Sequence, residues 1–222
     1  MKKNFALVVL CTLLLAMAPI KKTHVLFFGD SITQTAVNKG GYIDRIQRYI
    51  DSTGKNEAWQ LTGAGISGNK VYDLYLRMDE DVIAKNPDVV VIFIGVNDVW
   101  HKTTSGTGTD KDKFEKFYTA IIKKLQAKQI SVILCTPAAI GEKYDNSNQQ
   151  DGDLNAYSGI IRRLAKSMNC ELIDLRKIFM DYELANNKEN KESGILTTDR
   201  VHLNESGNAL VASEMMKAAG IQ

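Results

Sequence analysis

Five short apolar runs, separated by amphipathic segments, constrain what this chain can fold into more than any other feature. The runs lie near residues 24–28, 59–62, 89–94, 131–135 and 171–174. Runs of this length without polar alternation suit parallel strands that are covered on both faces. The sequence therefore predicts a sheet that is buried between two layers.

Helical patterns fill the spaces between these runs. Apolar residues recur at helical spacing over 114–125 and 154–168, and we interpret both stripes as core. Asn204 can cap a last helix near the C-terminus. Alternating strands and helices predict one doubly wound α/β domain over residues 23–222, with its chemistry at the carboxyl ends of the strands.

The first 18 residues differ from the rest of the chain. Lys2 and Lys3 precede an apolar stretch over 5–18 that is broken only by Thr12. This layout is typical of a secretory signal peptide, and the stretch is shorter than the roughly 20 residues that span a bilayer. We therefore predict a signal peptide at 1–18, export to the periplasm or the medium, and no membrane span in the mature protein. A buried N-terminal strand or helix is the alternative.

Charge and cysteine content exclude several classes of protein. A net charge of +2, without a basic run, argues against a nucleic-acid partner. Removal of the signal peptide leaves Cys135 and Cys170, which are too few for a disulfide framework and match no metal site. Cys135 ends the fourth run and Cys170 begins the fifth, so we expect two free thiols at opposite ends of the sheet.

Residues with catalytic potential directly follow the apolar runs. Ser31, in Gly-Asp-Ser-Ile-Thr, follows the first run, where it is a nucleophile if a base lies nearby and otherwise a turn residue. Asn97, in Gly-Val-Asn-Asp, follows the third run; its amide could donate to an oxyanion, although asparagine there is usually a turn former. The glycine-rich segment 63–69 lacks the spacing of phosphate-binding loops, and a backbone N–H from Gly65 fits an oxyanion donor better.

A base is available near the C-terminus. His202 follows Asp199 by three residues, an offset that lets the carboxylate reach the ring and fix its tautomer. We interpret His24, which opens a strand, and His101, which follows a tryptophan, as structural. Asp30 is interpreted as an anchor of the turn that holds the serine.

These four blocks, in this order, resemble the SGNH hydrolases, the GDSL-type esterases and lipases. The resemblance runs from about residue 23 to the C-terminus. It implies a single-domain, flavodoxin-like α/β/α sandwich with five parallel strands, no metal or other cofactor, and carboxylic ester hydrolysis. The implied site has Ser31 as nucleophile, His202 as base, Asp199 as its partner, and an oxyanion hole from Ser31, Gly65 and Asn97. The second block often carries asparagine where this chain has Gly63.

The expected substrate is a short-chain ester, above all an acetyl ester, of a carbohydrate or another small polar alcohol. Segments 101–110 and 141–153, expected to enter the cleft, are polar and offer no apolar wall to a long acyl chain. Alternatively, they are solvated loops and the pocket is built elsewhere. The alternative functions are a lysophospholipase-like or thioesterase-like lipolytic enzyme, an acyltransferase, and an inactive glycan-binding module.

Overall fold

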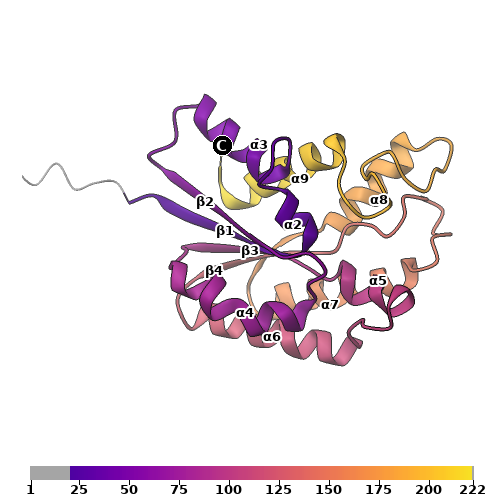
Figure 1. Ribbon diagram of the computed structural model, residues 1–222, viewed down its shortest axis with the longest axis horizontal. Helices are drawn as coiled ribbons and strands as arrows, with labels where there is room; N and C mark the ends of the chain where they lie inside the picture. Colours follow the sequence, from indigo (N-terminus) through magenta and orange to yellow (C-terminus); the bar gives the residue numbers. More distant parts are fainter. Residues whose placement is uncertain (1–20, 222) are drawn as a thin grey trace, which may run out of the picture.

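A five-stranded, all-parallel sheet runs through the middle of the protein (Figure 1). The computed structural model describes residues 21–221, so the predicted signal peptide lies outside the described residues. The strand order β2–β1–β3–β4–β5 is that of the flavodoxin-like fold, and it confirms the predicted α/β class. The strands are β1 (Thr23–Gly29), β2 (Trp59–Gly65), β3 (Val89–Phe93), β4 (Ser131–Cys135) and β5 (Glu171–Ile173).

Helices cover both faces of the sheet. In Figure 1, α3 and α9 lie above the sheet, and α4 and α6 lie below it. The predicted helical stripes fall in α6 and α7, and the Asn204 side chain caps α9 by accepting from the Gly207 N–H at 3.0 Å. The helices are α2 (Ser31–Thr35), α3 (Tyr42–Ser52), α4 (Val71–Asp81), the short η1 (Ile83–Lys85), α5 (Val96–Thr104), α6 (Lys111–Gln126), α7 (Asp151–Ser167), α8 (Leu175–Asn186) and α9 (Glu205–Ala219).

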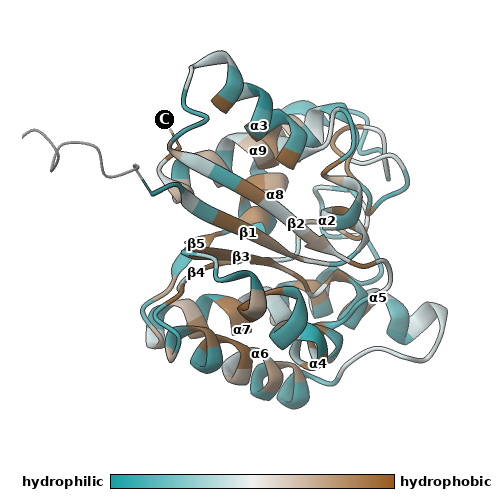
Figure 2. Cartoon of the chain, turned by 60° about the vertical axis from the view of Figure 1, so that its left-hand side comes forward, coloured by the Kyte–Doolittle hydropathy of each residue, from teal (hydrophilic) through white to brown (hydrophobic). Residues whose placement is uncertain are grey.

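The strands are apolar because both of their faces are covered. Val90, Val91 and Ile92 of β3 are at most 1% exposed. Burying each such side chain contributes about 1.5–3 kcal/mol relative to leaving it exposed. Figure 2 shows these central strands in brown between helices whose outward sides are teal. The core therefore consists of two apolar layers, one on each face of the sheet.

The carboxyl ends of β1 and β3 lie side by side. Gly29 at the end of β1 is level with Phe93 of β3 on one side and with Gly65 of β2 on the other. The chain leaves β1 and β3 toward opposite faces, so this edge is the topological switch point where such folds bind ligands. Residues that follow these strands are consequently gathered in one place.

Both cysteines of the described chain are free thiols, as the sequence predicted. Cys135 is level with Ile173 of β5, three residues beyond Cys170. At about 3.3 Å per residue, the two positions are separated by roughly 10 Å along the strands, whereas a disulfide needs Cα atoms within about 7 Å. Across residues 21–221, no helix is both long and apolar enough to cross a bilayer.

The two thiols should differ in reactivity. Cys135 is fully buried and burial raises the pKa of its thiol far above the usual range, whereas Cys170 is only partly buried. The thiolate is the reactive form. Iodoacetamide should therefore label Cys170 in the native protein and Cys135 only after unfolding, as read by mass spectrometry of peptides. Equal labelling rates in the native state would contradict this assignment.

Candidate active site

Ser31 is the first residue of α2, two residues beyond the end of β1. The Asp30 carboxylate caps this helix by accepting from the Ile32 N–H at 2.9 Å. Asp30 is 1% exposed, and burial raises its pKa to about 7 although the hydrogen bond from Ile32 lowers it. The structure thus supports the interpretation of Asp30 as an anchor that fixes where the Ser31 side chain points.

A chain of two hydrogen bonds joins Ser31, His202 and Asp199. The Ser31 Oγ lies 2.9 Å from Nε2 of His202, and Nδ1 of His202 lies 2.7 Å from Oδ2 of Asp199. Because a carboxylate only accepts, Nδ1 carries the ring proton and Nε2 is left to accept from the serine hydroxyl. The fold therefore brings Ser31 and His202, which are 171 positions apart in the sequence, into direct contact.

The Asp199 carboxylate also organises its own turn. Its Oδ1 accepts from the N–H groups of Val201 at 3.1 Å and His202 at 2.8 Å. Partial burial would raise the pKa of Asp199, but hydrogen bonds from the N–H and the ring of His202 outweigh it, and the pKa is lowered. Asp199 therefore stays ionised and aligned with the imidazole, although half of its side chain is exposed.

Asn97 lies in the first turn of α5, directly after β3, and is 3% exposed. Its Nδ2 donates to the backbone oxygen of Asn69 at 3.1 Å, which leaves the second amide proton free. The Asp98 side chain accepts from the Val71 N–H at 3.2 Å and joins the start of α4 to this helix. The glycine-rich segment after β2 is therefore held against Asn97.

Gly65 is packed more tightly than the sequence suggested. A Cβ at this position would lie 2.1 Å from the Gln34 nitrogen and 2.7 Å from the Asp30 oxygen. The N–H of the next residue, Ile66, donates to the Gly29 oxygen across the β1–β2 pair at 3.2 Å. Because successive N–H groups of a strand point to opposite sides, the Gly65 N–H is directed away from β1.

Trp100 is a site neighbour that the sequence analysis missed. Its ring stands edge-on to the His202 ring, with 6.5 Å between centroids. Trp100 follows Asn97 by three residues, and side chains three apart share one side of a helix. A helix beginning directly after β3 was the signal that could have identified it.

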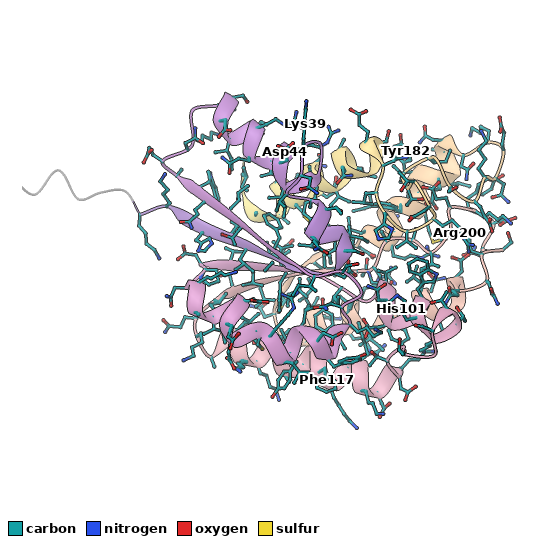
Figure 3. The ribbon with its side chains drawn as sticks, in the orientation of Figure 1. Lys39, Asp44, His101, Phe117, Tyr182 and Arg200 are labelled. Atoms are coloured by element: carbon teal, nitrogen blue, oxygen red, sulfur yellow. The ribbon has the colours of Figure 1, made fainter. Side chains whose placement is uncertain are left out.

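The other two histidines do not reach Ser31. His24 Nε2 lies 2.9 Å from Thr62 Oγ1, and His24 is the second residue of β1, whereas Ser31 follows the carboxyl end of that strand. The ring of His101 lies beside Trp100, with 5.8 Å between centroids, and burial lowers its pKa with a further contribution from Lys70. Figure 3 shows His101 and Arg200 at the side of the molecule toward which the strands point.

A groove of about 630 Å³ lies between the end of α2 and the start of α9, and neither Ser31 nor His202 lines it. One wall runs from Thr35, at the end of α2, to Arg48 in α3. The other wall contains Thr198 and Leu203, which flank the turn that carries Asp199 and His202. Hydrogen bonds join the walls, from the Tyr42 N–H to Asn208 Oδ1 at 2.9 Å and from Arg45 to Glu205 at 3.3 Å. Neither 101–110 nor 141–153 lines it, so the expectation that they enter the cleft does not hold for this groove. Its lining is Thr35, Asn38, Lys39, Gly40, Gly41, Arg45, Arg48, Thr198, Leu203, Asn204, Glu205 and Asn208.

Comparison with known families agrees with this geometry. Residues 27–210 match the model of the GDSL-like lipase/acylhydrolase family. The chain belongs to this family. Lipases and acylhydrolases cleave carboxylic esters, so the chain is a carboxylic ester hydrolase, as its four sequence blocks predicted.

Individual family members cover most of the chain. A crystal structure of an acetyl xylan esterase, AlAXEase, is 64% identical, covers 88% of this chain and 98% of its own, and superposes with a TM-score of 0.87. An acetylxylan esterase of Geobacillus stearothermophilus is 29% identical over 89% of this chain and 94% of its own. An uncharacterized lipoprotein of Bacillus subtilis is 24% identical over 84% of this chain and 85% of its own.

The close approach at Gly65 yields a testable prediction. Gly65→Ala places a methyl group against the backbone of α2, and overpacking of this kind costs about 1–3 kcal/mol. We expect a lower free energy of unfolding in urea and a loss of esterase activity, because α2 carries Ser31. Gly152→Ala is the control, since its Cβ meets no atom within 4 Å. Equal stability of the two variants would contradict the prediction.

Proposed function

We propose that this esterase removes acetyl groups from carbohydrate esters, with Ser31 as nucleophile and His202 as general base. The observation that carries the proposal is the continuous hydrogen-bond chain from the serine hydroxyl through the imidazole to the Asp199 carboxylate. A serine hydroxyl is a poor nucleophile unless an adjacent base takes its proton. The 2.9 Å contact supplies that base in the required tautomer.

The first chemical step is acyl transfer to the enzyme. Ser31 Oγ attacks the ester carbonyl while Nε2 of His202 takes the hydroxyl proton, and the carbonyl electrons move onto oxygen. When the tetrahedral intermediate collapses, the bond to the alcohol breaks and His202 returns the proton to the leaving oxygen. Asp199 stabilises the imidazolium that exists between these two transfers.

The second step releases the acid. A water molecule gives a proton to Nε2 of His202 and attacks the acyl carbonyl, and collapse of this intermediate returns the proton to Ser31 Oγ. In both steps the oxyanion needs donors that are already in place. The free Nδ2 proton of the buried Asn97 and the Ser31 N–H at the start of α2 are two such donors.

The third donor belongs to the glycine-rich segment after β2. The sequence predicted the N–H of Gly65, but its direction within β2 argues against that group. Gly68 immediately precedes Asn69, whose backbone oxygen accepts from Asn97. We therefore assign the backbone donor to Gly68, while Gly65 provides the close packing that places this segment beside α2.

The substrate assignment rests on the relatives and on the groove. Two of the most similar proteins are acetyl xylan esterases. The groove between the end of α2 and the start of α9, which adjoins the helix of Ser31 and the turn of His202, is lined mainly by hydroxyl, amide and charged side chains, with Leu203 as its one large aliphatic residue. Such a surface matches the hydroxyl groups of a sugar chain, whereas a long acyl chain needs apolar contact to contribute about 0.8 kcal/mol per CH₂.

Export is part of the same proposal. The signal-peptide pattern at residues 1–18 directs the enzyme across a membrane, and one relative of the described domain is a lipoprotein. Polymeric carbohydrate esters are found outside the cytoplasm, where an exported esterase has access to them. An acyltransferase would use the same acyl-enzyme, and product analysis with an added sugar acceptor distinguishes the two activities.

Replacement of either partner of the serine–histidine contact should abolish turnover. Ser31→Ala and His202→Ala should each lower kcat on the order of 10³-fold or more while the proteins remain folded, since such groups act as a unit. Turnover of p-nitrophenyl acetate and circular dichroism give the two measurements. His24→Ala is the control, because this histidine lies at the other end of the sheet. A folded Ser31→Ala protein with wild-type kcat would refute the mechanism.

Substrate preference should follow the polar groove. Along p-nitrophenyl esters, kcat/KM should be highest for acetate and should fall toward octanoate and palmitate. Lys39→Ala, at the rim, should raise KM for acetylated xylo-oligosaccharides about 2-fold to 10-fold, the value of one hydrogen bond, and leave p-nitrophenyl acetate unchanged. Lys128→Ala, an exposed lysine outside the groove, is the control. A rise of kcat/KM beyond octanoate would instead indicate a lipolytic enzyme.

A further inference from the structure

The loop that carries His202 is not part of the sheet. It runs from the end of α8 to the start of α9, and its one ladder contact is an isolated antiparallel bridge between Thr197 and Leu203. Buried backbone N–H groups that lack a strand or helix partner need another acceptor. The Leu196 and Thr197 side chains are fully buried, so this requirement applies to the loop.

The side chain of Glu142 meets this requirement. Its Oε1 accepts from the N–H groups of Leu196 at 2.6 Å and Thr197 at 2.5 Å, and its Oε2 accepts from the Ile195 N–H at 2.8 Å. Glu142 is 0% exposed and lies 55 positions before Thr197 in the sequence. Hydrogen bonds from backbone N–H groups to a carboxylate are short and about twice as strong as neutral ones.

The backbone of Glu142 is held by hydrogen bonds at both its N–H and its oxygen. Its N–H donates to the Glu192 oxygen at 3.0 Å, and its backbone oxygen accepts from Asn187 Nδ2 at 2.8 Å. The preceding residue, Gly141, donates to the Arg200 oxygen at 2.9 Å. The segment after β4 therefore contacts the loop at both its entrance and the turn before His202.

Further hydrogen bonds connect Thr197 and Thr198 to the turn that carries His202. Thr197 Oγ1 accepts from the Arg200 N–H at 3.1 Å, and the Thr198 N–H donates to the His202 oxygen at 2.8 Å. Arg200 has a φ of +82°, a conformation that residues other than glycine adopt only when their surroundings impose it. These contacts impose it here, and His202 and Asp199 face Ser31 as a consequence.

We propose that Glu142 is a positioning residue of the esterase: its buried carboxylate holds residues 195–197 and thereby sets the distance between His202 and Ser31. The proposal rests on the proposed function, since it concerns the same serine–histidine contact. Glu142 touches no reacting atom, and its effect on catalysis passes through the loop. A displacement of about 1 Å at such a contact can cost on the order of 100-fold in rate.

Glu183 provides a matched control. It is 1% exposed and lies in the same buried group of carboxylates, but its Oε1 has no hydrogen-bond partner among residues 21–221. Burial, together with the nearby Glu142, raises the pKa of Glu183 to about 8, so glutamine resembles its neutral form. Glu183→Gln therefore changes a buried carboxyl group while the hydrogen bonds to residues 195–197 remain with Glu142.

The experiment compares Glu142→Gln with Glu183→Gln on p-nitrophenyl acetate. Glutamine at 142 turns an NH₂ group toward one of the three N–H donors, and the loop must shift. We expect kcat to fall about 10-fold or more with KM within about twofold, while Glu183→Gln keeps wild-type kinetics. A folded Glu142→Gln protein with the kcat of Glu183→Gln would overturn the proposal.

Glu142→Asp is the second variant if glutamine prevents folding. It keeps the charge but withdraws the carboxylate by one methylene group, so the same loss in kcat at constant KM is expected. If neither Glu142 variant folds while Glu183→Gln does, the whole fold requires Glu142. That result would overturn a specific role in positioning His202. Inactive wild-type enzyme would instead refute the proposed function, which keeps the two tests distinct.

Discussion

The absence of a side chain at Gly29 is the constraint on which the site depends. A Cβ there would lie 2.4 Å from the Phe93 oxygen and 2.3 Å from Thr33 Oγ1. Contacts this short leave no room for any other residue between β3 and the first turn of α2. Gly29 therefore lets α2 start directly above the end of the sheet, and Ser31 is presented beside the residues that follow β3.

Much of this arrangement could be predicted because local patterns determine it. Apolar runs and helical stripes predicted the five strands and helices such as α6, since burial of these side chains is the main driving force of folding. The rule that parallel strands end at one edge brought Ser31 and Asn97 together. Asp199 and His202 were predicted because a three-residue offset fits a turn.

What could not be predicted depends on contacts between distant segments. Glu142 lies in a polar stretch that looks like a solvated loop, and only the folded chain shows its side chain buried against residues 195–197. The direction of the Gly65 N–H depends on the register of β2 with β1, which periodicity alone does not give. The groove likewise forms between two segments that are at least 150 positions apart in the sequence. Nor could the sequence show how the site's carboxyl groups differ: burial raises the pKa of Asp98 to about 6, whereas hydrogen bonds from His202 keep the pKa of Asp199 below its usual value.

The hydrogen bond between Ser31 and His202 also determines at which stage of synthesis and folding the enzyme can become active. It joins the first strand–helix unit of the domain to the loop before the last helix, so it has one of the largest sequence separations in the chain. Contacts of this kind form late, because the entropy of closing the intervening chain must be offset first. The serine gains its base only once nearly the entire domain has been synthesised and folded. A chain that is truncated or incompletely folded therefore carries an unactivated serine, and hydrolytic activity is itself a measure of complete folding.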